Sequence, residues 1–237
     1  MHNDIRLVAM DLDGTLTQHK TPLSPTHRAT LTRLSEKYKL LMVGAGQVMR
    51  IFNQMEQFPI DIIGNYGMQE SAMVDGEFKI IREDTAEPDK EYFNKTCQYL
   101  REKYGYTEYA GGHLEFHPSG MVTFCLIGSG AKVEDKVVFD PDRSKRRAIH
   151  EDVKQVFSDY IVFVGGSSSF DMAPFPFNKA YALAKYCDER GIKHSEVVYI
   201  GDDYGEGGND ESVYKADFNY LKIDDYRDFA NVVKELL

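Results

Sequence analysis

The segment that most constrains the fold is Asp11-Leu12-Asp13-Gly14-Thr15, which directly follows a largely apolar run at residues 5–10. A short apolar run that ends in a turn is typical of a buried strand. Side chains alternate along a strand, so continuing the strand would point Asp11 and Asp13 in the same direction, out of its carboxyl end. Ligands of open α/β sheets bind at that end. The pattern therefore predicts an α/β enzyme.

The two carboxylates also indicate the kind of chemistry. Two anions this close repel each other unless a cation lies between them or one stays protonated. With Mg²⁺ present, one carboxylate can attack phosphorus while the other handles the proton of the leaving group. Gly14 permits a sharp exit from the strand, and we expect Thr15 to bond within that turn. The alternative is an ordinary Asp-Gly hairpin turn, but the preceding buried strand favours catalysis.

Composition limits the partners. The chain of 237 residues carries a net charge of −10, which repels nucleic acid and anionic lipid. Its three cysteines are widely spaced without a CxxC pair, so we expect neither a disulfide framework nor a zinc site. The start resembles no signal peptide, and no apolar run approaches about 18 residues. We therefore expect a soluble cytoplasmic protein with no nucleic-acid or membrane partner.

The order of predicted elements indicates two parts. Strands and amphipathic helices alternate up to about residue 81, followed by a differently ordered stretch, after which the first pattern resumes. We predict strands at 4–10, 39–43, 61–63, 114–116, 122–127, 161–164, 168–172, 196–200 and 220–223. We predict helices at 24–38, from the second strand to 57, and at 87–103, 145–157 and 179–189, with a hairpin at 73–78. This order predicts an α/β core, 1–81 and 175–237, interrupted by an α+β insert, 82–174.

Further chemically suggestive residues follow other predicted strands. Asp202 ends the strand at 196–200, and Asp210 follows in the same loop. If that strand is parallel to the first, these carboxylates face Asp11 and offer the hard oxygen ligands that Mg²⁺ prefers. Alone, such a loop is usually only a turn. Lys179, at a helix start, could neutralise the carboxylates and hold a phosphate, although most lysines are solvated.

Other motifs carry weaker signals. The segment Gly44-Ala45-Gly46-Gln47 enters a helix, where backbone N–H groups can bind an anion, or where small residues simply make a turn. The seven histidines show no metal-ligand spacing. The basic run at 145–147 is expected on a solvated helix face.

Together these motifs resemble the haloacid dehalogenase (HAD) superfamily of phosphotransferases, whose signature is DxDGT, a Ser or Thr, a Lys and an acidic GD…ND loop. Three of the four are present in order. The segments 112–116, 164–171 and 207–211 are similar to eukaryotic-type phosphomannomutases, and the likeness covers almost the whole chain. It implies a Rossmann-like, doubly wound parallel-sheet core with a Cof-like, type IIB cap that carries sugar-recognition groups.

The resemblance implies catalytic and metal-binding roles. Asp11 would be the nucleophile that becomes an aspartyl phosphate, Asp13 the acid and base, and Lys179 the ligand of the transferring phosphoryl group. Mg²⁺ would bind Asp11, the backbone carbonyl of Asp13, Asp202, and Asn209 or Asp210.

The substrate-binding positions combine matches and departures. Ser169 and Asp171 match a Ser-x-Asp that contacts sugar hydroxyls in the mutases, although a hydrogen-bonded strand edge without a ligand is the alternative. Gly46 and Gln47 stand where the mutases have Ser and Asp, so the hydroxyl that would hold the phosphoryl group is missing. We therefore expect Gly46→Ser to raise kcat/KM. Lys20 replaces an Arg just past the nucleophile loop.

A second group of departures decides between hydrolysis and isomerisation. The cap arginines that grip the second phosphate in the mutases correspond to Ala110 and Ser129, and His117 replaces another Arg. A mutase must hold a bisphosphate intermediate while it turns around, which requires a distal anion site. We therefore predict a Mg²⁺-dependent phosphatase of small, sugar-like phosphorylated metabolites. The alternatives are a phosphohexomutase of altered specificity and a catalytically weakened binding protein, and a homodimer through the cap is a further expectation.

Overall fold

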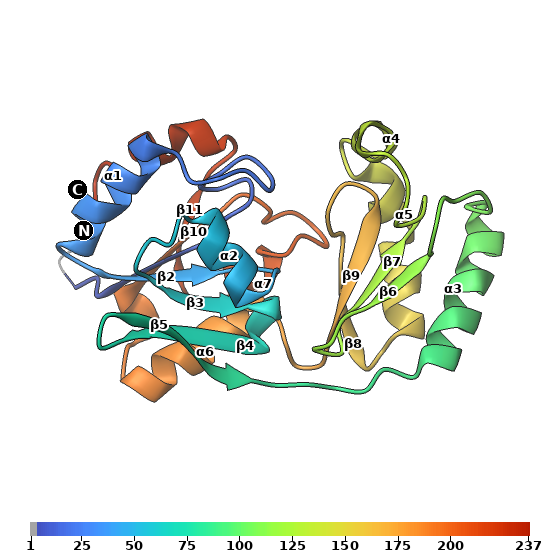
Figure 1. Cartoon of the computed structure of the whole chain (residues 1–237), viewed down its shortest axis with the longest axis horizontal. Coiled ribbons are helices and arrows are strands. Elements are labelled where there is room, and N and C mark those ends of the chain that lie inside the picture. The colour runs from blue at the N-terminus through green and yellow to red at the C-terminus, as the bar shows by residue number, and fades with distance from the viewer. Residues whose placement is uncertain (1–3) are drawn as a thin grey trace. The chain divides into compact units, whose positions relative to one another are not determined.

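The computed structural model describes residues 4–237, and its contacts divide the chain into two compact units (Figure 1). The first unit comprises residues up to Glu83 together with Asn178–Gly205 and Asp210–Leu237. The second comprises Asp84–Phe177 and Glu206–Asn209. This second unit begins and ends within a few residues of the expected insert, 82–174, and also takes in 206–209 from the acidic loop.

The elements of the first unit alternate between strand and helix before and after the insert. Its strands are β1 (Leu7–Met10), β2 (Lys39–Val43), β3 (Asp61–Gly64), β4 (Gln69–Val74), β5 (Glu77–Glu83), β10 (Val197–Gly201) and β11 (Asn219–Lys222). Its helices are α1 (Pro25–Ser35), α2 (Val48–Gln54), α6 (Lys179–Arg190), α7 (Glu211–Tyr214) and α8 (Phe229–Val232), with 3₁₀ turns η1 (Asn65–Gly67), η2 (His194–Glu196) and η3 (Tyr226–Asp228).

The seven strands form one sheet in the order β11-β10-β1-β2-β3-β4-β5. The first five in this order are parallel, and β4 and β5 add an antiparallel hairpin. Asp75 and Gly76 both take positive φ at its turn, as the Asp-Gly pair predicts. The predicted α/β class with a mainly parallel sheet is therefore confirmed.

Both faces of this sheet are buried. In β1, Val8 and Met10 join the apolar cluster that α1 and α2 cover, whereas Leu7 and Ala9 join the cluster that α6 covers. Figure 1 shows α1 and α6 on opposite sides of the sheet. A strand that is apolar on both faces must lie between two layers, so β1 is an interior strand covered by helices on both sides. Asp11 directly follows the carboxyl end of β1. Ligands of open α/β sheets bind at the carboxyl ends of the parallel strands.

The second unit has a four-stranded antiparallel sheet in the order β6-β7-β9-β8. Its elements are α3 (Lys90–Tyr104), β6 (Leu114–Phe116), β7 (Val122–Cys125), α4 (Val133–Phe139), α5 (Ser144–Val156), β8 (Tyr160–Phe163) and β9 (Ser169–Pro174). Apolar side chains of one sheet face pack against α3 and α5. The other face carries a cross-strand row of polar residues, Glu115, Thr123 and Asp171.

Helices α4 and α2 differ from the sequence predictions. Helix α4 was not predicted, because none of its side chains is buried and its valines favour strands by propensity. Helix α2 ends at Gln54 instead of 57, since Glu56 and Gln57 take left-handed backbone conformations that end a helix.

The helices within residues 4–237 include none with the length and apolar character needed to cross a membrane.

Candidate active site

Asp11 lies at the centre of the parallel sheet, one residue past the end of β1. Its backbone N–H donates to the carbonyl of Ile200 in β10 at 3.0 Å, which holds the chain in register beyond the strand. Its side chain is buried. Burial and the nearby Asp210 and Asp202 raise the pKa of Asp11, although Lys179 opposes them. The carboxylate therefore needs positive charge to remain ionised.

Lys179 supplies part of that charge. It is the first residue of α6, and Asn178 caps this helix by accepting from the N–H of Tyr181 at 2.8 Å. Its ammonium group is fully buried, 2.8 Å from Asp11 Oδ1 and 2.8 Å from Asp210 Oδ1. Burial alone would lower the pKa of Lys179, but the two carboxylates outweigh it and raise the pKa. The structure thus brings together the lysine and the nucleophile expected from the sequence.

Asp210 is buried and fixed by several donors. Besides Lys179, it accepts from the hydroxyl of Tyr199 at 2.6 Å and from the backbone N–H of Asp203 at 3.1 Å. These bonds hold its carboxylate against the ammonium group. Asp210 therefore orients Lys179 as well as adding negative charge.

Asp202 follows β10, the parallel neighbour of β1. It accepts a hydrogen bond at 2.9 Å from the hydroxyl of Thr15, which we had expected to bond within its own turn. Burial and repulsion from Asp210 raise the pKa of Asp202 to about 6. Gly14 passes so close that a Cβ there would lie 2.6 Å from Asp202 Cγ, and its φ of +98° also suits only glycine well.

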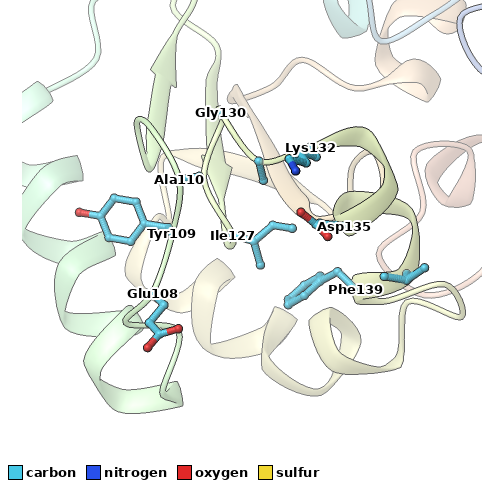
Figure 2. Close-up of a pocket in the computed structure, with 10 residues that line it drawn as sticks. Glu108, Tyr109, Ala110, Ile127, Gly130, Lys132, Asp135 and Phe139 are labelled. Atoms are coloured by element: carbon cyan, nitrogen blue, oxygen red, sulfur yellow. The ribbon is translucent and has the colours of Figure 1, made fainter.

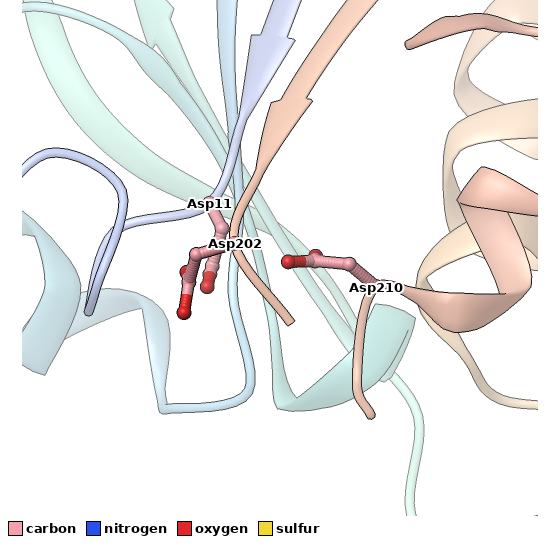
Figure 3. A group of neighbouring side chains, drawn as sticks. All are labelled: Asp11, Asp202 and Asp210. Atoms are coloured by element: carbon pink, nitrogen blue, oxygen red, sulfur yellow. The ribbon is translucent and has the colours of Figure 1, made fainter. Parts of the chain in front are cut away.

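Asp11, Asp202 and Asp210 form an acidic cluster (Figure 3). Each offers a carboxylate oxygen, and these oxygens all lie within 4.8 Å of one another. Figure 3 shows Asp11 and Asp202 side by side, with Asp210 directed towards them. Three carboxylates against one ammonium group leave an excess of negative charge, and the donors are all hard oxygens. This donor set fits Mg²⁺.

Asp13 contacts a different set of residues. The chain turns after Asp11 instead of continuing as the expected strand. Asp13 accepts from Gln54 Nε2 at 2.7 Å and from the backbone N–H of Lys20 at 2.8 Å, and it pairs with Arg50 at 3.3 Å. Burial opposes ionisation, but these donors outweigh it and lower the pKa of Asp13.

Arg50 and Gln54 are site residues that the sequence analysis missed. They stand four residues apart on α2, and Arg50 donates to Gln54 Oε1 at 2.7 Å. Their spacing puts both on one helix face, which was a detectable signal. Gly46 lies directly beside them, because a Cβ there would be 2.7 Å from the Cζ of Arg50.

Gln47, Lys20 and Asn209 are further residues that the sequence predicts in the site. Gln47 is the N-cap position of α2, but its side chain makes no capping bond. Lys20 contributes its backbone N–H to Asp13, while its side chain is exposed. Asn209 belongs to the 206–209 segment that groups with the second unit, and its predicted metal role stays a prediction.

Ser169 and Asp171 stand two residues apart on β9, which is an interior strand and not an edge. Asp171 accepts from the hydroxyl of Thr123 at 3.0 Å, and Ser169 donates to the carbonyl of Gly165 at 3.2 Å. Burial raises the pKa of Asp171 above its usual range. Both side chains therefore have local partners, and their reading of a ligand stays a prediction.

The basic run at 145–147 is partly buried, contrary to expectation. Arg146 is fully buried and pairs with Asp140 at 2.8 Å. Its guanidinium also donates to the carbonyls of Gly165 at 2.6 Å and of Ser169 at 3.1 Å. Pairing of this kind was not visible in the sequence because Asp140 lies before α5, outside the periodic helix pattern.

The positions that lack the mutase arginines lie in backbone-bonded loops. Ala110 donates to the carbonyl of Ile127 at 3.0 Å, and Ser129 donates through its backbone to Gly112 at 2.7 Å. His117 contacts the hydroxyl of Thr123 at 2.9 Å. Beside Ala110 the second unit has an open cavity of about 570 Å³, whose lining includes Tyr109 and Lys132 (Figure 2).

Known proteins share this fold and resemble this sequence. The sequence model of the eukaryotic phosphomannomutase family matches residues 27–235. The chain is 27% identical over 227 residues to a phosphomannomutase of Drosophila melanogaster, covering 90% of this chain and 88% of the relative. It is 29% identical over 224 residues to a phosphomannomutase of Saccharomyces cerevisiae, covering 88% and 84%.

Solved structures show the same fold. An IMP-nucleotidase of Plasmodium falciparum superposes with a TM-score of 0.69 at 14% identity, covering 98% of this chain and 68% of that one. A haloacid dehalogenase-like hydrolase of Bacteroides thetaiotaomicron gives 0.59 at 15% identity, covering 98% and 100%. The fold and cluster thus define a HAD superfamily protein of the phosphatase and mutase type. Within it, the chain belongs to the eukaryotic phosphomannomutase family.

Proposed function

We propose that this chain is a Mg²⁺-dependent phosphatase of small, sugar-like phosphorylated metabolites. The observation that carries the proposal is the buried ammonium of Lys179, 2.8 Å from Asp11, within a cluster of three carboxylates. A nucleophilic carboxylate needs a neighbouring cation to accept a phosphate group that is itself anionic. Lys179 meets this need for Asp11, and a divalent cation in the acidic cluster would complete it.

Two displacements account for hydrolysis. In the first, an oxygen of Asp11 attacks phosphorus, the bond to the leaving oxygen breaks, and that oxygen takes a proton from the protonated form of Asp13, which is left as the carboxylate. In the second, water attacks phosphorus, Asp13 takes its proton, and the bond to Asp11 breaks to release inorganic phosphate. Lys179 holds the phosphoryl oxygens in both steps.

Mg²⁺ bound by Asp11, Asp202 and the backbone carbonyl of Asp13, with Asn209 or Asp210, would neutralise charge on the phosphoryl oxygens. The excess negative charge of the acidic cluster supports this assignment.

The second unit would act as the cap that recognises the sugar, through Ser169 and Asp171. Ala110, Ser129 and His117 support hydrolysis over isomerisation, because no guanidinium stands at these positions to hold a distal phosphate. Lys20, which replaces an Arg just past the nucleophile loop, keeps the positive charge at its position.

A phosphohexomutase is the second candidate. It is favoured by the family match over 27–235 and by relatives named phosphomannomutase that align along most of their length. In that case the aspartyl phosphate would be returned to a second oxygen of the sugar instead of to water.

The test is a panel of hexose, pentose and smaller phosphomonoesters incubated with Mg²⁺ and followed by ³¹P NMR. The spectra separate inorganic phosphate from exchange between sugar 1-phosphate and 6-phosphate. Each substrate is run with and without a hexose bisphosphate, which a mutase would use. We expect phosphate release to dominate, with the Asp11→Asn variant as the control for contaminating phosphatase. Isomerisation that outpaces release would establish the mutase instead.

A further inference from the structure

We propose that Arg50 is the phosphoryl-binding residue that replaces the hydroxyl missing at Gly46. This inference rests on the proposed phosphoryl-transfer function and assigns a substrate-binding role that the signature motif does not contain. All the residues involved belong to the first unit.

The guanidinium of Arg50 lies directly beside Gly46. A Cβ built on Gly46 would lie 2.7 Å from the Cζ of Arg50, so the guanidinium fills the volume that a side chain there would occupy. The φ angle of Gly46 is not positive, so its backbone conformation does not require glycine. A side chain at this position would instead displace the guanidinium, the flexible end of Arg50, from its place beside the Cα of Gly46. The guanidinium of Arg50 therefore occupies the space in which the side chain of a serine at position 46 would begin.

Contacts on both sides hold the guanidinium in this position. Nη1 and Nη2 of Arg50 each lie 3.3 Å from Oδ2 of Asp13, and Nη1 donates to Gln54 Oε1 at 2.7 Å. Gln54 in turn donates to Asp13 Oδ1 at 2.7 Å and to the hydroxyl of Thr17 at 3.0 Å. The three side chains form a closed network between α2 and the nucleophile loop. An arginine held this way loses little further freedom when it binds an anion.

The network leaves donors for a ligand. A guanidinium has five N–H groups, and the hydrogen bonds from Arg50 to Asp13 and Gln54 use three at most. The side chain is 39% exposed, whereas Asp13 beside it is 18% exposed. In this proposal, a tetrahedral oxyanion bound at Asp11 accepts from Arg50 while the guanidinium stays paired with Asp13. Arginine is well suited to this contact because its planar donors match two phosphoryl oxygens.

The position of Arg50 beside Gly46 reverses the expected effect of Gly46→Ser. A serine there would push the guanidinium away from Asp13, so the substitution should lower activity in the otherwise unaltered chain instead of raising it. In an Arg50→Gln background the same serine should recover part of the lost binding, because the hydroxyl then has room beside a shorter, neutral side chain.

The experiment measures binding of inorganic tungstate, a tetrahedral phosphate mimic, by calorimetry with Mg²⁺ present. The chains compared are the wild type, Arg50→Gln, Arg50→Lys, Gly46→Ser and the Gly46→Ser/Arg50→Gln double variant. Arg33→Gln, an exposed arginine on α1, is the matched control. Thermal unfolding of each chain reports whether it is folded.

We expect Arg50→Gln to weaken tungstate binding about 10- to 100-fold, Arg50→Lys to weaken it less, and Arg33→Gln to leave it unchanged. Gly46→Ser should weaken binding alone and strengthen it in the Arg50→Gln background. Such a reversal of sign is not expected of a residue that only stabilises the fold. Unchanged binding in Arg50→Gln, additive effects of the two substitutions, or absence of binding to the wild type would each overturn the proposal.

This readout is independent of the proposed function. If the wild type binds tungstate through Arg50 but releases no phosphate from any ester, the function fails and the Arg50 site stands. If Asp11→Asn abolishes turnover while Arg50→Gln binds normally, the Arg50 site fails and the function stands.

Discussion

Lys179 in the first unit and Arg146 in the second are both fully buried cations, but their surroundings differ in charge. Lys179 contacts Asp11 and Asp210 and lies near Asp202, so three carboxylates surround one ammonium group. Arg146 contacts the single carboxylate of Asp140 and several backbone carbonyls. The charges of Arg146 and Asp140 balance each other, whereas the group around Lys179 has more negative than positive charges. A buried cluster with excess charge is organised for a ligand, and a balanced one for stability.

The largest effect is expected at Asp11. Asp11→Asn should lower turnover of the best phosphomonoester by at least about three orders of magnitude, because an amide cannot accept the phosphoryl group. It should not lower the unfolding temperature, since burial and repulsion already oppose the ionised carboxylate there. Steady-state kinetics and thermal unfolding check both parts. Near-normal turnover would show that another residue is the nucleophile.

Asp13 should matter for proton transfer more than for binding. Asp13→Asn should slow turnover by roughly two to four orders of magnitude. The loss should be smaller for p-nitrophenyl phosphate than for an alkyl phosphate, because a good leaving group needs less help from an acid. Kinetics on both esters provide the comparison. Equal losses on the two would rule out the acid role.

The balanced pair in the second unit should show the opposite behaviour to Asp11. Asp140→Asn should lower the free energy of unfolding by about 3–5 kcal/mol, because it leaves the guanidinium of Arg146 buried and uncompensated. Urea unfolding measures this loss. Asp152→Asn, which removes an exposed partner of Lys103, is the control and should change little.

The same pair gives a pH dependence of stability. Burial opposes ionisation of Asp140, but Arg146 and the N–H groups of Lys145 and Arg146 outweigh it and lower its pKa below the usual value. Its stabilisation is therefore present above the unfolded pKa of about 4 and is lost as the pH falls through the lower folded pKa. Urea midpoints of the wild type and Asp140→Asn should converge at acidic pH. A constant difference down to pH 2 would contradict the pairing.

The smallest effect is expected for sugar recognition in the second unit. Asp171→Ala should cost about 1–3 kcal/mol in kcat/KM on a hexose phosphate, because it removes a hydroxyl-reading contact. It should leave p-nitrophenyl phosphate nearly unaffected. Loss of the bond from Thr123 is common to both substrates, so a uniform decrease would assign Asp171 to the structure of β9 alone.

Local patterns predicted much of this arrangement because the relevant residues lie at the ends of regular elements. Asp11 and Asp202 each follow an apolar strand, and parallel strands bring such ends together whatever the intervening chain does. The position of Lys179 at a helix start was readable for the same reason. The fold class followed from the alternation of strands with amphipathic helices.

The residues that escaped prediction depend on contacts between distant segments. Arg50 resembles any solvated arginine on a helix until the turn after Asp11 brings Asp13 against it. Arg146 belongs to a basic run, and only the fold shows that one of its three members is buried against Asp140. The sequence records that a charge exists, whereas its burial depends on the partner that the fold supplies.

The most direct test of the contrast between the two buried clusters is a calorimetric titration with Mg²⁺. We compare the wild type with Asp202→Asn, which reduces the excess charge, and with Asp217→Ala, which removes an exposed carboxylate elsewhere in the first unit. The account predicts binding to the wild type and to Asp217→Ala, strongly weakened binding to Asp202→Asn, and loss of phosphatase turnover after chelation. Equal Mg²⁺ affinity in all three chains, or full turnover in the presence of a chelator, would contradict it.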